Sequence, residues 1–463
     1  MARIARSARK PYASRLPTLK ERQAHGKALR AKVPRAAQGQ WAPWPGRPDP
    51  IEQLRQQNRQ RVKSLVPIRY ARMLQSPFAF MRGAAAVMAH DLAKLPLTGY
   101  HVNACGDCHL ANFGGYATPE RNFVFDINDF DETLLAPWEF DVKRLAASIV
   151  VAGRSTNFDD DCCDDAALSA TRHYREHMAR LAKKTALQVW YSHLDVEDIL
   201  KDIAQTSGQL QSLERGALRV RGRTPDVILG KMTENHYGVR RFIDNPPFVY
   251  HSGADHAHSQ IMHSVIDKYR DSLRADVRVL FDRYQLVDMA VKVVGVGSVG
   301  TRCGVLLFMA GKDDALILQT KEANHSVLET PKNQSPFRNQ GQRVVTGQRI
   351  MQAASDAFLG WTSYRGRDYY VRQLRDMKAS IELELLTGRS FIAYAQVCGT
   401  ILARAHARTG DAAVISGYLG ASDRFDRAIA RFARQYANQT ERDYAALKAA
   451  HKKGTIHPAP TAR

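Results

Sequence analysis

The sequence predicts an α+β fold with two lobes, and the main reasons are its length and a change of periodicity near residue 287. At 463 residues the chain is long enough for two or three domains or for one two-lobed fold with a large core. Its apolar fraction of 44% is typical of a globular protein. Helical spacing of apolar residues gives way to strand-like runs separated by Gly-rich turns. We expect four parts in order: a basic arm at 1–49, a mainly helical lobe at 50–286, a β-rich lobe at 287–385, and C-terminal helices at 386–463 that return to the first lobe.

The chain is strongly basic, and the excess is largest in the arm. Its 67 Lys and Arg outnumber 46 Asp and Glu and give a formal charge of +21. Such a charge attracts polyanions and nucleotides through its long-range field. Residues 1–49 carry 12 Lys or Arg and two acidic residues, so the arm either contacts nucleic acid or forms a solvated, partly docked tail. We expect the tail, with weak polyanion contact at most, because neither interleaved aromatic residues nor a nucleic-acid-binding module accompanies the charge.

The sequence also bears on location and on cysteine chemistry. No apolar run approaches the length of a transmembrane helix, and the first residues lack the apolar segment of an export signal. We therefore expect a cytoplasmic protein without membrane contact, whose six cysteines are reduced thiols. Cys105, Cys108 and His109 match the C-x-x-C-H pattern of haem attachment, but that chemistry requires export. The contexts of a redox pair or a zinc site are not evident either.

Periodicity and capping residues place several helices of the first lobe. They predict a basic helix over 50–74 broken at Pro67, a small-residue helix over 84–95, and an amphipathic helix that begins near Trp138. Arg82 either touches a phosphate or pairs with a surface carboxylate. The acidic residues 159–161 are interpreted as the start of a long helix, because acids there favour the helix dipole. Four histidines lack the spacing of a zinc-binding helix and are assigned to a loop and a helix start: His251, His256, His258 and His263.

Two polar loops carry the candidate catalytic chemistry. The first is GDCHLAN at 106–112, and the second lies in FDINDFDE at 125–132, after an apolar strand. Phosphoryl transfer needs one carboxylate to accept or orient a hydroxyl proton, and further oxygen ligands to hold Mg²⁺. Asp107 suits the first role, and Asn112 and Asp129 suit the second. The alternative is plain turn chemistry, in which Asp and Asn side chains bond to nearby backbone.

The β-rich lobe is expected to begin with a glycine-rich hairpin. Strand patterns at 287–294 and 301–309 flank GVGSVG at 295–300, and a third strand at 315–321 ends in Lys321. A dinucleotide-binding fold would continue from such glycines into a helix, whereas a second strand follows here. The turn can then lie over phosphates that Lys321 also binds; a solvated surface lysine is the alternative. The expected nucleotide-binding residues are Gly295, Gly297, Ser298, Gly300 and Lys321, with Glu329 as the nearest acidic candidate to hold the lysine.

These motifs resemble parts of the protein-kinase-like superfamily. GDCHLAN followed by FDINDFDE is similar to H-G-D-x-x-x-x-N followed by I-D-F in aminoglycoside- and choline-kinase-like phosphotransferases, with Cys105 in place of the His. The resemblance implies that Asp141 supports the catalytic loop from a helix start. It also implies that residues 369–374 lead into a hinge that holds adenine. In the helix at 391–406, Arg404 and His406 either contact the loop or pack at the helix end.

The order of the motifs is the reverse of that in kinases. Asp107 precedes Lys321 by 214 residues (321 minus 107), so the resemblance implies a two-lobed kinase-like fold with circularly permuted connectivity. Between about residues 50 and 450 the chain resembles the bacterial domain-of-unknown-function family numbered 2252. That resemblance is carried by the motifs above together with SPFAFMRG, GQRVVTGQ, YYVRQLRDMK and LARAHART.

These expectations combine into an ATP-dependent phosphotransferase that uses Mg²⁺ and acts on a hydroxyl acceptor, either a small molecule or a protein. An AMP-transferring kinase-like enzyme is one alternative, and a non-catalytic nucleotide- or nucleic-acid-binding protein with a degenerate site is another. If the kinase-like interpretation holds, Lys321 and Asp129 act on the same triphosphate. Their charged groups should then lie within roughly 10 Å of each other, across a cleft covered by the glycine turn.

Overall fold

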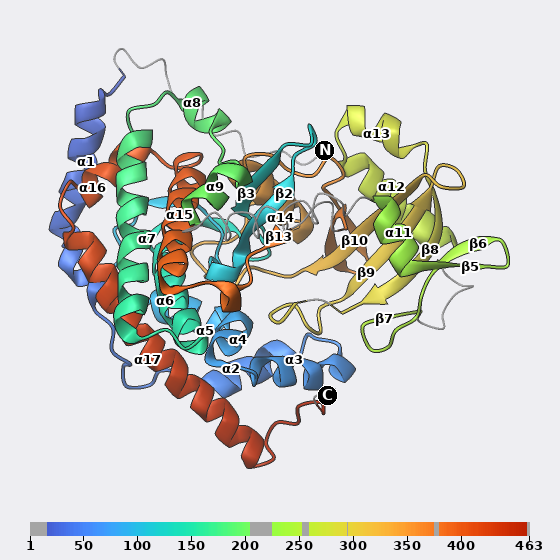
Figure 1. Cartoon of the computed structure of the whole chain (residues 1–463), viewed down its shortest axis with the longest axis horizontal. Coiled ribbons are helices and arrows are strands. Elements are labelled where there is room, and N and C mark those ends of the chain that lie inside the picture. Colours follow the sequence, from blue (N-terminus) through green and yellow to red (C-terminus); the bar gives the residue numbers. More distant parts are fainter. Residues whose placement is uncertain (1–15, 204–224, 252–258, 294, 375–378, 461–463) are drawn as a thin grey trace.

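The chain folds into a mixed α+β structure, as its periodicity predicts. The computed structural model describes residues 16–203, 225–251, 259–293, 295–374 and 379–460. Long helices gather on one side of the molecule and a six-stranded sheet lies on the other (Figure 1). Two short strands, β2 and β3, lie between these two parts (Figure 1).

The helices fall into an N-terminal set, a central set and a C-terminal set. The N-terminal helices are α1 (Leu19–Lys32), α2 (Pro50–Asn58), α3 (Val66–Met73), α4 (Pro77–Gly83) and α5 (Ala85–Leu92). The central helices are α6 (Glu139–Ser155), α7 (Asp160–Leu181), α8 (Ala186–Tyr191), α9 (Val196–Ile203), α11 (Pro225–Met232), α12 (Ser259–Ser272) and α13 (Ala275–Phe281). The remaining helices are α14 (Gln340–Met351), α15 (Gly388–Ala407), α16 (Ala412–Leu419) and α17 (Arg424–Lys452).

The strands form one large and three small antiparallel sheets among the described residues. The large sheet has the order β11-β12-β10-β9-β8-β7, and its strands are β7 (Val249–Tyr250), β8 (Gln285–Lys292), β9 (Cys303–Met309), β10 (Ala315–Ala323), β11 (Gly360–Tyr364) and β12 (Arg367–Gln373). The small sheets have the orders β13-β2-β3, β1-β4 and β5-β6. Their strands are β1 (His101–Ala104), β2 (Phe113–Ala117), β3 (Phe123–Ile127), β4 (Leu134–Pro137), β5 (Thr233–His236), β6 (Val239–Phe242) and β13 (Ala379–Ser380).

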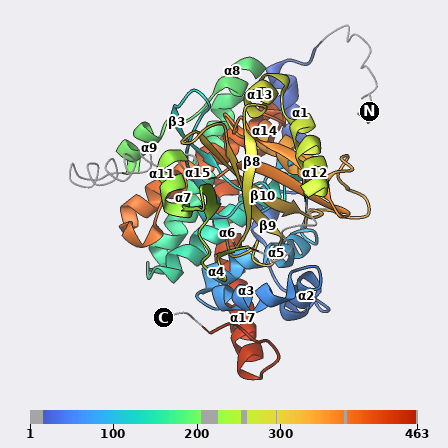
Figure 2. The same cartoon turned by 90° about the vertical axis from the view of Figure 1, so that its right-hand side faces the viewer.

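The large sheet is covered on both faces because its strands alternate. Side chains on successive residues of a strand point to opposite faces. Leu306 and Phe308 of β9 therefore pack with α12 and α13, while Val305 and Leu307 pack toward α11 on the other face. Figure 2, which looks onto the right-hand side of Figure 1, shows α11 and α12 on either side of this sheet.

The largest core lies in the helical part. The helix α15 packs along α7, and α17 packs against α6 and α7. Every residue of α6 from 139 to 153 is buried, so α6 is the central helix of this part, although its N-terminal turn carries charged residues. That burial matters for the candidate site, because the buried N-terminal turn of α6 contacts the GDCHLAN loop.

The N-terminal segment is docked more fully than a solvated tail would be. The helix α1 packs against α16, and it does so closely at Gly26. A Cβ at that position would lie 1.8 Å from the carbonyl oxygen of Val414, so only glycine fits. The side chain of Arg30 donates to the carbonyl oxygens of Gly417 and Tyr418 at the C-terminal end of α16, at 2.6 and 2.8 Å. Residues 1–15 lie outside the described part of the chain.

Two other details differ from the sequence-based predictions. The helix expected over 50–74 is divided into α2 and α3, and Pro67 stands in the first turn of α3, because its missing N–H is tolerated there. The strands β5 to β7 interrupt a region expected to be mainly helical. His251 lies in a loop, as expected, and its two ring nitrogens are within hydrogen-bond distance of the carboxylates of Asp244 and Asp288. His256 and His258 lie outside the described residues.

Other helical predictions are confirmed. The carboxylate of Asp159 caps α7 by accepting from the backbone N–H of Cys162 at 2.7 Å. The helix expected at 391–406 is α15, and the strand expected at 369–374 is β12. Among the described residues, no helix has the length and apolarity needed to cross a bilayer.

Candidate functional site

The GDCHLAN loop is anchored to the start of α6 by Asp141. The loop follows β1, and the backbone N–H groups of Cys105 and Gly106 donate to the two carboxylate oxygens of Asp141 at 2.6 and 2.9 Å. Gly106 has a positive φ of 83°, which a residue with a side chain adopts only with strain. The expected support of this loop by Asp141 is therefore confirmed.

The helix α15 reinforces that support from a distant part of the sequence. The Nε2 atom of His406 lies 3.2 Å from Oδ2 of Asp141, and its Nδ1 atom lies 2.9 Å from the hydroxyl of Tyr174. His406 thus acts on the loop through Asp141. Arg404 does not contact the loop: it forms a buried ion pair with Asp126 of β3 at 2.6 Å.

Asp107 and Asn112 are held in fixed orientations within the loop. The side-chain amide of Asn112 donates to the backbone carbonyl of Asp107 at 2.6 Å. The buried Arg144 of α6 donates from Nε to Oδ1 of Asp107, also at 2.6 Å. This arginine holds one oxygen of the Asp107 carboxylate and leaves the other oxygen without a contact to Arg144. The sequence analysis did not identify Arg144, although its position in the basic, amphipathic start of α6 is a recognisable signal.

The two polar loops lie side by side because β2 and β3 pair. In an antiparallel hairpin the residue before the first strand lies beside the residue after the second. Accordingly, the backbone N–H of Asn128 donates to the carbonyl of Asn112 at 2.8 Å. The thiol of Cys105 adds a second link, since it donates to the backbone carbonyl of Asp129 at 3.3 Å. The cysteine that replaces the histidine of the kinase-like motif therefore joins the two loops.

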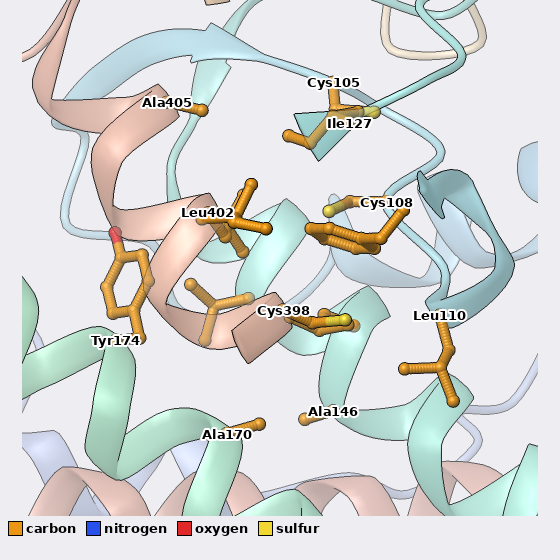
Figure 3. Packing of buried hydrophobic residues seen from close by; sticks show 14 of the residues in the cluster. Cys105, Cys108, Leu110, Ile127, Ala146, Ala170, Tyr174, Cys398, Leu402 and Ala405 are labelled. Carbon is orange, nitrogen blue, oxygen red and sulfur yellow. The ribbon is translucent and has the colours of Figure 1, made fainter. Parts of the chain in front are cut away.

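The cysteines behave as structural thiols. All six are free, and Cys105, Cys108 and Cys398 are buried in the large core (Figure 3). A hydrogen bond that Cys105 donates to Cys108, together with burial, raises the pKa of the Cys105 thiol well above its usual value, so this thiol stays neutral. Its burial among Ile127 and Leu402 leaves no surface for a haem (Figure 3).

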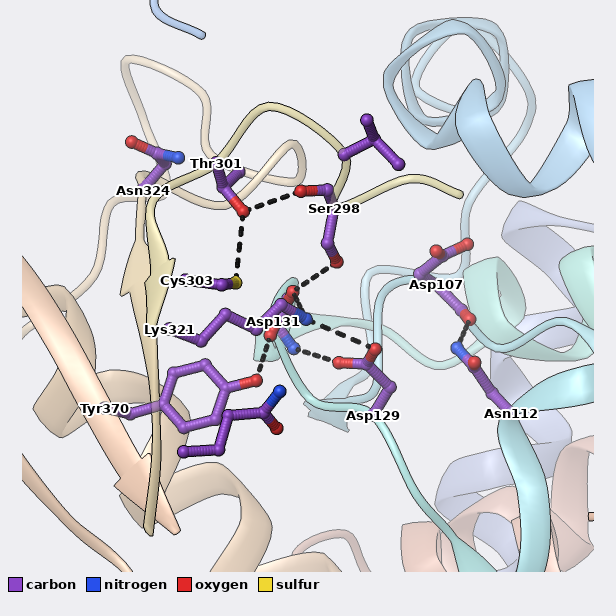
Figure 4. A network of polar contacts seen from close by, with 12 residues as sticks. Asp107, Asn112, Asp129, Asp131, Ser298, Thr301, Cys303, Lys321, Asn324 and Tyr370 are labelled. Atoms are coloured by element: carbon purple, nitrogen blue, oxygen red, sulfur yellow. Dashed lines mark hydrogen bonds and ion pairs between the residues drawn. The ribbon is translucent and has the colours of Figure 1, made fainter. Parts of the chain in front are cut away.

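Lys321 crosses from the large sheet to the second loop. Its Nζ atom lies 3.5 Å from Oδ2 of Asp129 and forms a closer ion pair with Asp131 (Figure 4). The expected proximity of Lys321 and Asp129 is confirmed. The lysine side chain is only 3% exposed. Burial lowers the pKa of Lys321, but Asp129 and Asp131 outweigh it and hold the pKa above its usual value, so the lysine is charged.

Asp131 is the centre of the polar network, and the sequence analysis missed it. Its Oδ1 accepts from the hydroxyl of Tyr370 at 2.8 Å, and its Oδ2 lies 3.4 Å from the Ser298 hydroxyl (Figure 4). Tyr370 stands directly opposite Lys321 in the β10–β12 register. The signal was present as the second acid of the D-F-D motif, but only the first acid has a counterpart in the kinase-like pattern.

Glu329 does not hold Lys321, contrary to expectation. Its carboxylate pairs with Nδ1 of His325 at 2.8 Å. The reason is geometric: Lys321 is still inside β10 and points toward Asp131, whereas Glu329 lies in the connection between β10 and α14. The two aspartates supply the negative charge that a glutamate would otherwise supply.

The glycine turn is a true hairpin connection between β8 and β9 and does not open a helix. It is held against the N-terminal helices. The backbone N–H of Val62 donates to the carbonyl of Gly300 at 2.8 Å, and Arg72 donates to the carbonyl of Gly295. At Gly297 a Cβ would lie 2.8 Å from the carbonyl oxygen of Arg82, so the close approach of the turn to α4 requires glycine.

Two cavities meet at the candidate site. The larger has a volume of about 790 Å³ and is lined by residues that include Tyr116, Leu316, Phe358, Arg372, Gln373 and Leu374. The smaller has a volume of about 270 Å³ and is lined by residues that include Asp107, His109, Asp131, Glu132, Gly297 and Ser298. Asn112, Asp129 and Gly295 line both. The glycine turn therefore lies over the same cavity as Asp107 and Asn112.

Burial shifts the pKa values of two side chains that line the smaller cavity, Glu132 and His109. Burial raises the pKa of Glu132 to about 7, even though the backbone N–H of Val327 donates to its carboxylate at 2.7 Å. His109 is buried, and burial lowers the pKa of its imidazole to about 4, so it is neutral at pH 7. No group of three or more His, Cys, Asp or Glu side chains that could hold a metal occurs among the described residues.

Comparison with known proteins assigns the family. The chain belongs to the family described as "Uncharacterized protein conserved in bacteria (DUF2252)", whose model matches residues 61–450. The matched region contains both polar loops, the glycine turn, Lys321 and α15. A search of curated proteins and a search of solved structures gave no match.

Proposed function

We propose that this protein is an ATP-dependent, Mg²⁺-requiring phosphotransferase with a kinase-like, two-lobed fold of permuted order. One observation carries the proposal: Lys321 of the sheet meets Asp129 of the second loop at 3.5 Å, where two cavities join beneath a glycine turn. A kinase-type site needs these groups around one triphosphate. They come from segments separated by about 190 residues, so their meeting is not a consequence of local sequence.

The larger cavity suits the nucleoside. A volume of about 790 Å³ lies within the usual range for a nucleotide-sized ligand. Leu316 and Phe358 supply apolar contacts, and Gln373 and Leu374 also line this cavity. The backbone N–H groups of Gln373 and Leu374 donate to Asp356 and Ile317, so apolar contact would be the main interaction with an adenine. The phosphates would then extend past Gly295 to the junction of the two cavities.

The donor set at the junction fits Mg²⁺. This ion prefers oxygen ligands and is usually held by one or two protein carboxylates together with substrate phosphates. Asp129 offers a carboxylate, and the side-chain oxygen of Asn112 is oriented away from Asp107, because the nitrogen of the amide donates to the Asp107 carbonyl. The absence of a larger acidic or histidine cluster among the described residues agrees with a metal shared between protein and nucleotide. A bound Mg²⁺ would neutralise phosphate charge and orient the triphosphate.

Lys321 and Asp107 would have different roles in the transfer of the phosphoryl group. Lys321 would turn from its ion pair with Asp131 to a phosphate oxygen of the bound nucleotide. The hydroxyl oxygen of the acceptor forms a bond to the γ-phosphorus, while the bond from that phosphorus to the β–γ bridging oxygen breaks and ADP leaves. The hydroxyl proton passes to Asp107, whose Oδ1 Arg144 holds, and from there to solvent.

Product analysis with labelled ATP tests the proposal. The protein is incubated with Mg²⁺ and ATP labelled at either the γ- or the α-phosphate, with a cell-extract fraction of small metabolites as acceptor. We expect transfer of the γ-label and release of ADP, and a loss of at least about a hundredfold in Asp107→Asn and Asp129→Asn. Asp313→Asn, at an exposed turn outside both cavities, is the matched control. Transfer of the α-label would show AMP transfer instead, and nucleotide binding without transfer of either label would indicate a non-catalytic binding protein.

A further inference from the structure

Two arginines from the N-terminal helices line the smaller cavity and not the larger one. Arg61 follows α2, and Arg82 is near the end of α4. Arg61 passes beneath the glycine turn and donates from Nη1 to the carbonyl of Val299 at 2.5 Å. Both residues therefore face the side of the candidate site that holds Asp107, away from the cavity assigned to the nucleoside.

The carboxylates of the smaller cavity already have cationic partners. Arg144 pairs with Asp107, and Arg302 and Arg367 pair with Glu322. Lys321 pairs with Asp131 and also lies 3.5 Å from Asp129. Glu132 has a pKa of about 7, so it carries only part of a charge at neutral pH. In contrast, no ion pair joins Arg61 or Arg82 to a carboxylate among the described residues. Arg61 and Arg82 are therefore the two arginines of the cavity lining, and neither is paired with a carboxylate in the described part of the chain.

One nitrogen of the Arg82 side chain lacks a hydrogen-bond acceptor in the described part of the chain. This nitrogen, Nε, is buried. The guanidinium lies 5.9 Å from the ring centre of Phe78, which supports a cation but accepts no strong hydrogen bond. Burial lowers the pKa of Arg82, and the charges of Asp107 and Asp129 only partly oppose this. A partly buried cation with an unpaired donor is unfavourable, and an anion bound in the cavity would supply both the charge and the acceptors.

We propose that the phosphoryl acceptor is a small alcohol that also carries a phosphate or carboxylate group, and that Arg61 and Arg82 bind this anionic group. The inference rests on the proposed function. The fixed, forked donors of arginine match these anions well. A cavity of about 270 Å³ admits a compact molecule, with its hydroxyl beside Asp107 and its anionic group beside Arg82. The ATP phosphates are already matched by Lys321, Mg²⁺ and the glycine turn, and need neither arginine.

Anion binding in the presence of nucleotide tests this proposal. Inorganic phosphate is titrated by calorimetry into protein saturated with Mg²⁺ and a non-hydrolysable ATP analogue, and acetate is titrated in parallel to separate a phosphate from a carboxylate preference. We expect phosphate or acetate to bind, and Arg82→Gln to weaken that binding by roughly tenfold or more, since a hydrogen-bonded charge is lost. Arg82→Lys should recover part of the affinity. Arg59→Gln, an exposed arginine of the same segment that does not line the cavity, should bind as the wild type does.

The outcomes separate this inference from the proposed function. If Arg82→Gln weakens binding of the nucleotide analogue as strongly as that of phosphate, Arg82 binds an ATP phosphate and the inference is overturned. Absence of binding by both phosphate and acetate also overturns it. The same titrations without nucleotide remain informative if the protein fails to bind ATP: phosphate or acetate binding that depends on Arg82 would support the anion site even though the phosphotransferase proposal had failed.

Discussion

At the scale of single residues, the ion pair between Lys321 and Asp131 determines whether the lysine is available to bind a phosphate. The lysine is almost fully buried, whereas Asp131 is 26% exposed, and Tyr370 donates to the same carboxylate. In the absence of ligand, Asp131 supplies the counter-charge that the proposed substrate phosphates would supply during catalysis. The pair therefore serves stability and would have to open for function.

Replacing Lys321 should separate these two contributions. We expect Lys321→Met to lower the free energy of unfolding by about 1–3 kcal/mol, because Asp131 keeps a partly buried charge without its partner. The double variant Lys321→Met with Asp131→Asn should recover most of that stability. We expect neither the single nor the double variant to turn over ATP. Urea unfolding and the labelled-ATP assay measure the two effects. Full stability in Lys321→Met alone would show that the ion pair contributes nothing to folding.

At the scale of elements, local patterns and the contacts implied by the motif resemblance were predictable, including that of Lys321 with Asp129, whereas other long-range partners were not. The strands β8, β9 and β10 were predicted within two residues of their observed ends, because alternating apolar residues and a Gly-rich turn are local signals. The role of Asp141 was also predicted, from the motif resemblance. The docking of α1 was not predicted, since the acceptors of Arg30 lie almost 390 residues away at the end of α16. The contacts of Asp131 and Arg82 were not predicted for the same reason, because the groups that face them come from distant segments of the chain.

The contact between α6 and α17 contains a buried lysine. Lys143 of α6 is 0% exposed, and its ammonium lies 5.0 Å from the ring centre of Phe432 of α17. Its Nζ atom has no hydrogen-bond acceptor among the described residues. Burial lowers the pKa of Lys143 to about 8, although Glu139 opposes this. The charge is therefore unfavourable in this contact at neutral pH.

Removing that charge should stabilise the protein. The lysine binds its proton more weakly in the folded than in the unfolded chain, so its contribution to stability rises as the pH increases from about 8 toward about 10.5. We expect Lys143→Met, which keeps the side-chain length, to raise the free energy of unfolding by about 1–2 kcal/mol at pH 7, with a smaller gain at pH 10. Urea unfolding at the two pH values measures this. A destabilised variant at pH 7 would show that the cation–aromatic contact outweighs the burial of charge.

At the scale of the whole molecule, the residues of the candidate site come from three segments that lie far apart in the sequence. The N-terminal half supplies Asp107, Asn112 and Asp129, the later sheet supplies the glycine turn and Lys321, and α15 then returns to hold Asp141 through His406. The segment from α2 to α4 contacts the glycine turn at Gly300 and Gly297. The helical part and the sheet are thus joined at the proposed nucleotide site, and a ligand bound there contacts both.

Binding of Mg-ATP should therefore stabilise the whole chain. A ligand that binds only the folded state adds RT ln(1 + [L]/Kd), which is about 2.7 kcal/mol at a hundredfold excess over Kd. The phosphates and the carboxylates of Asp129 and Asp131 repel each other without a cation between them, so ATP with EDTA should give little shift of the unfolding temperature, whereas ATP with Mg²⁺ or Mn²⁺ should give a clear one. Asp129→Asn should lose most of the metal-dependent part, while Asp313→Asn should keep it. If no divalent metal produces a shift with ATP in the wild-type protein, the assignment of the larger cavity to the nucleotide is wrong.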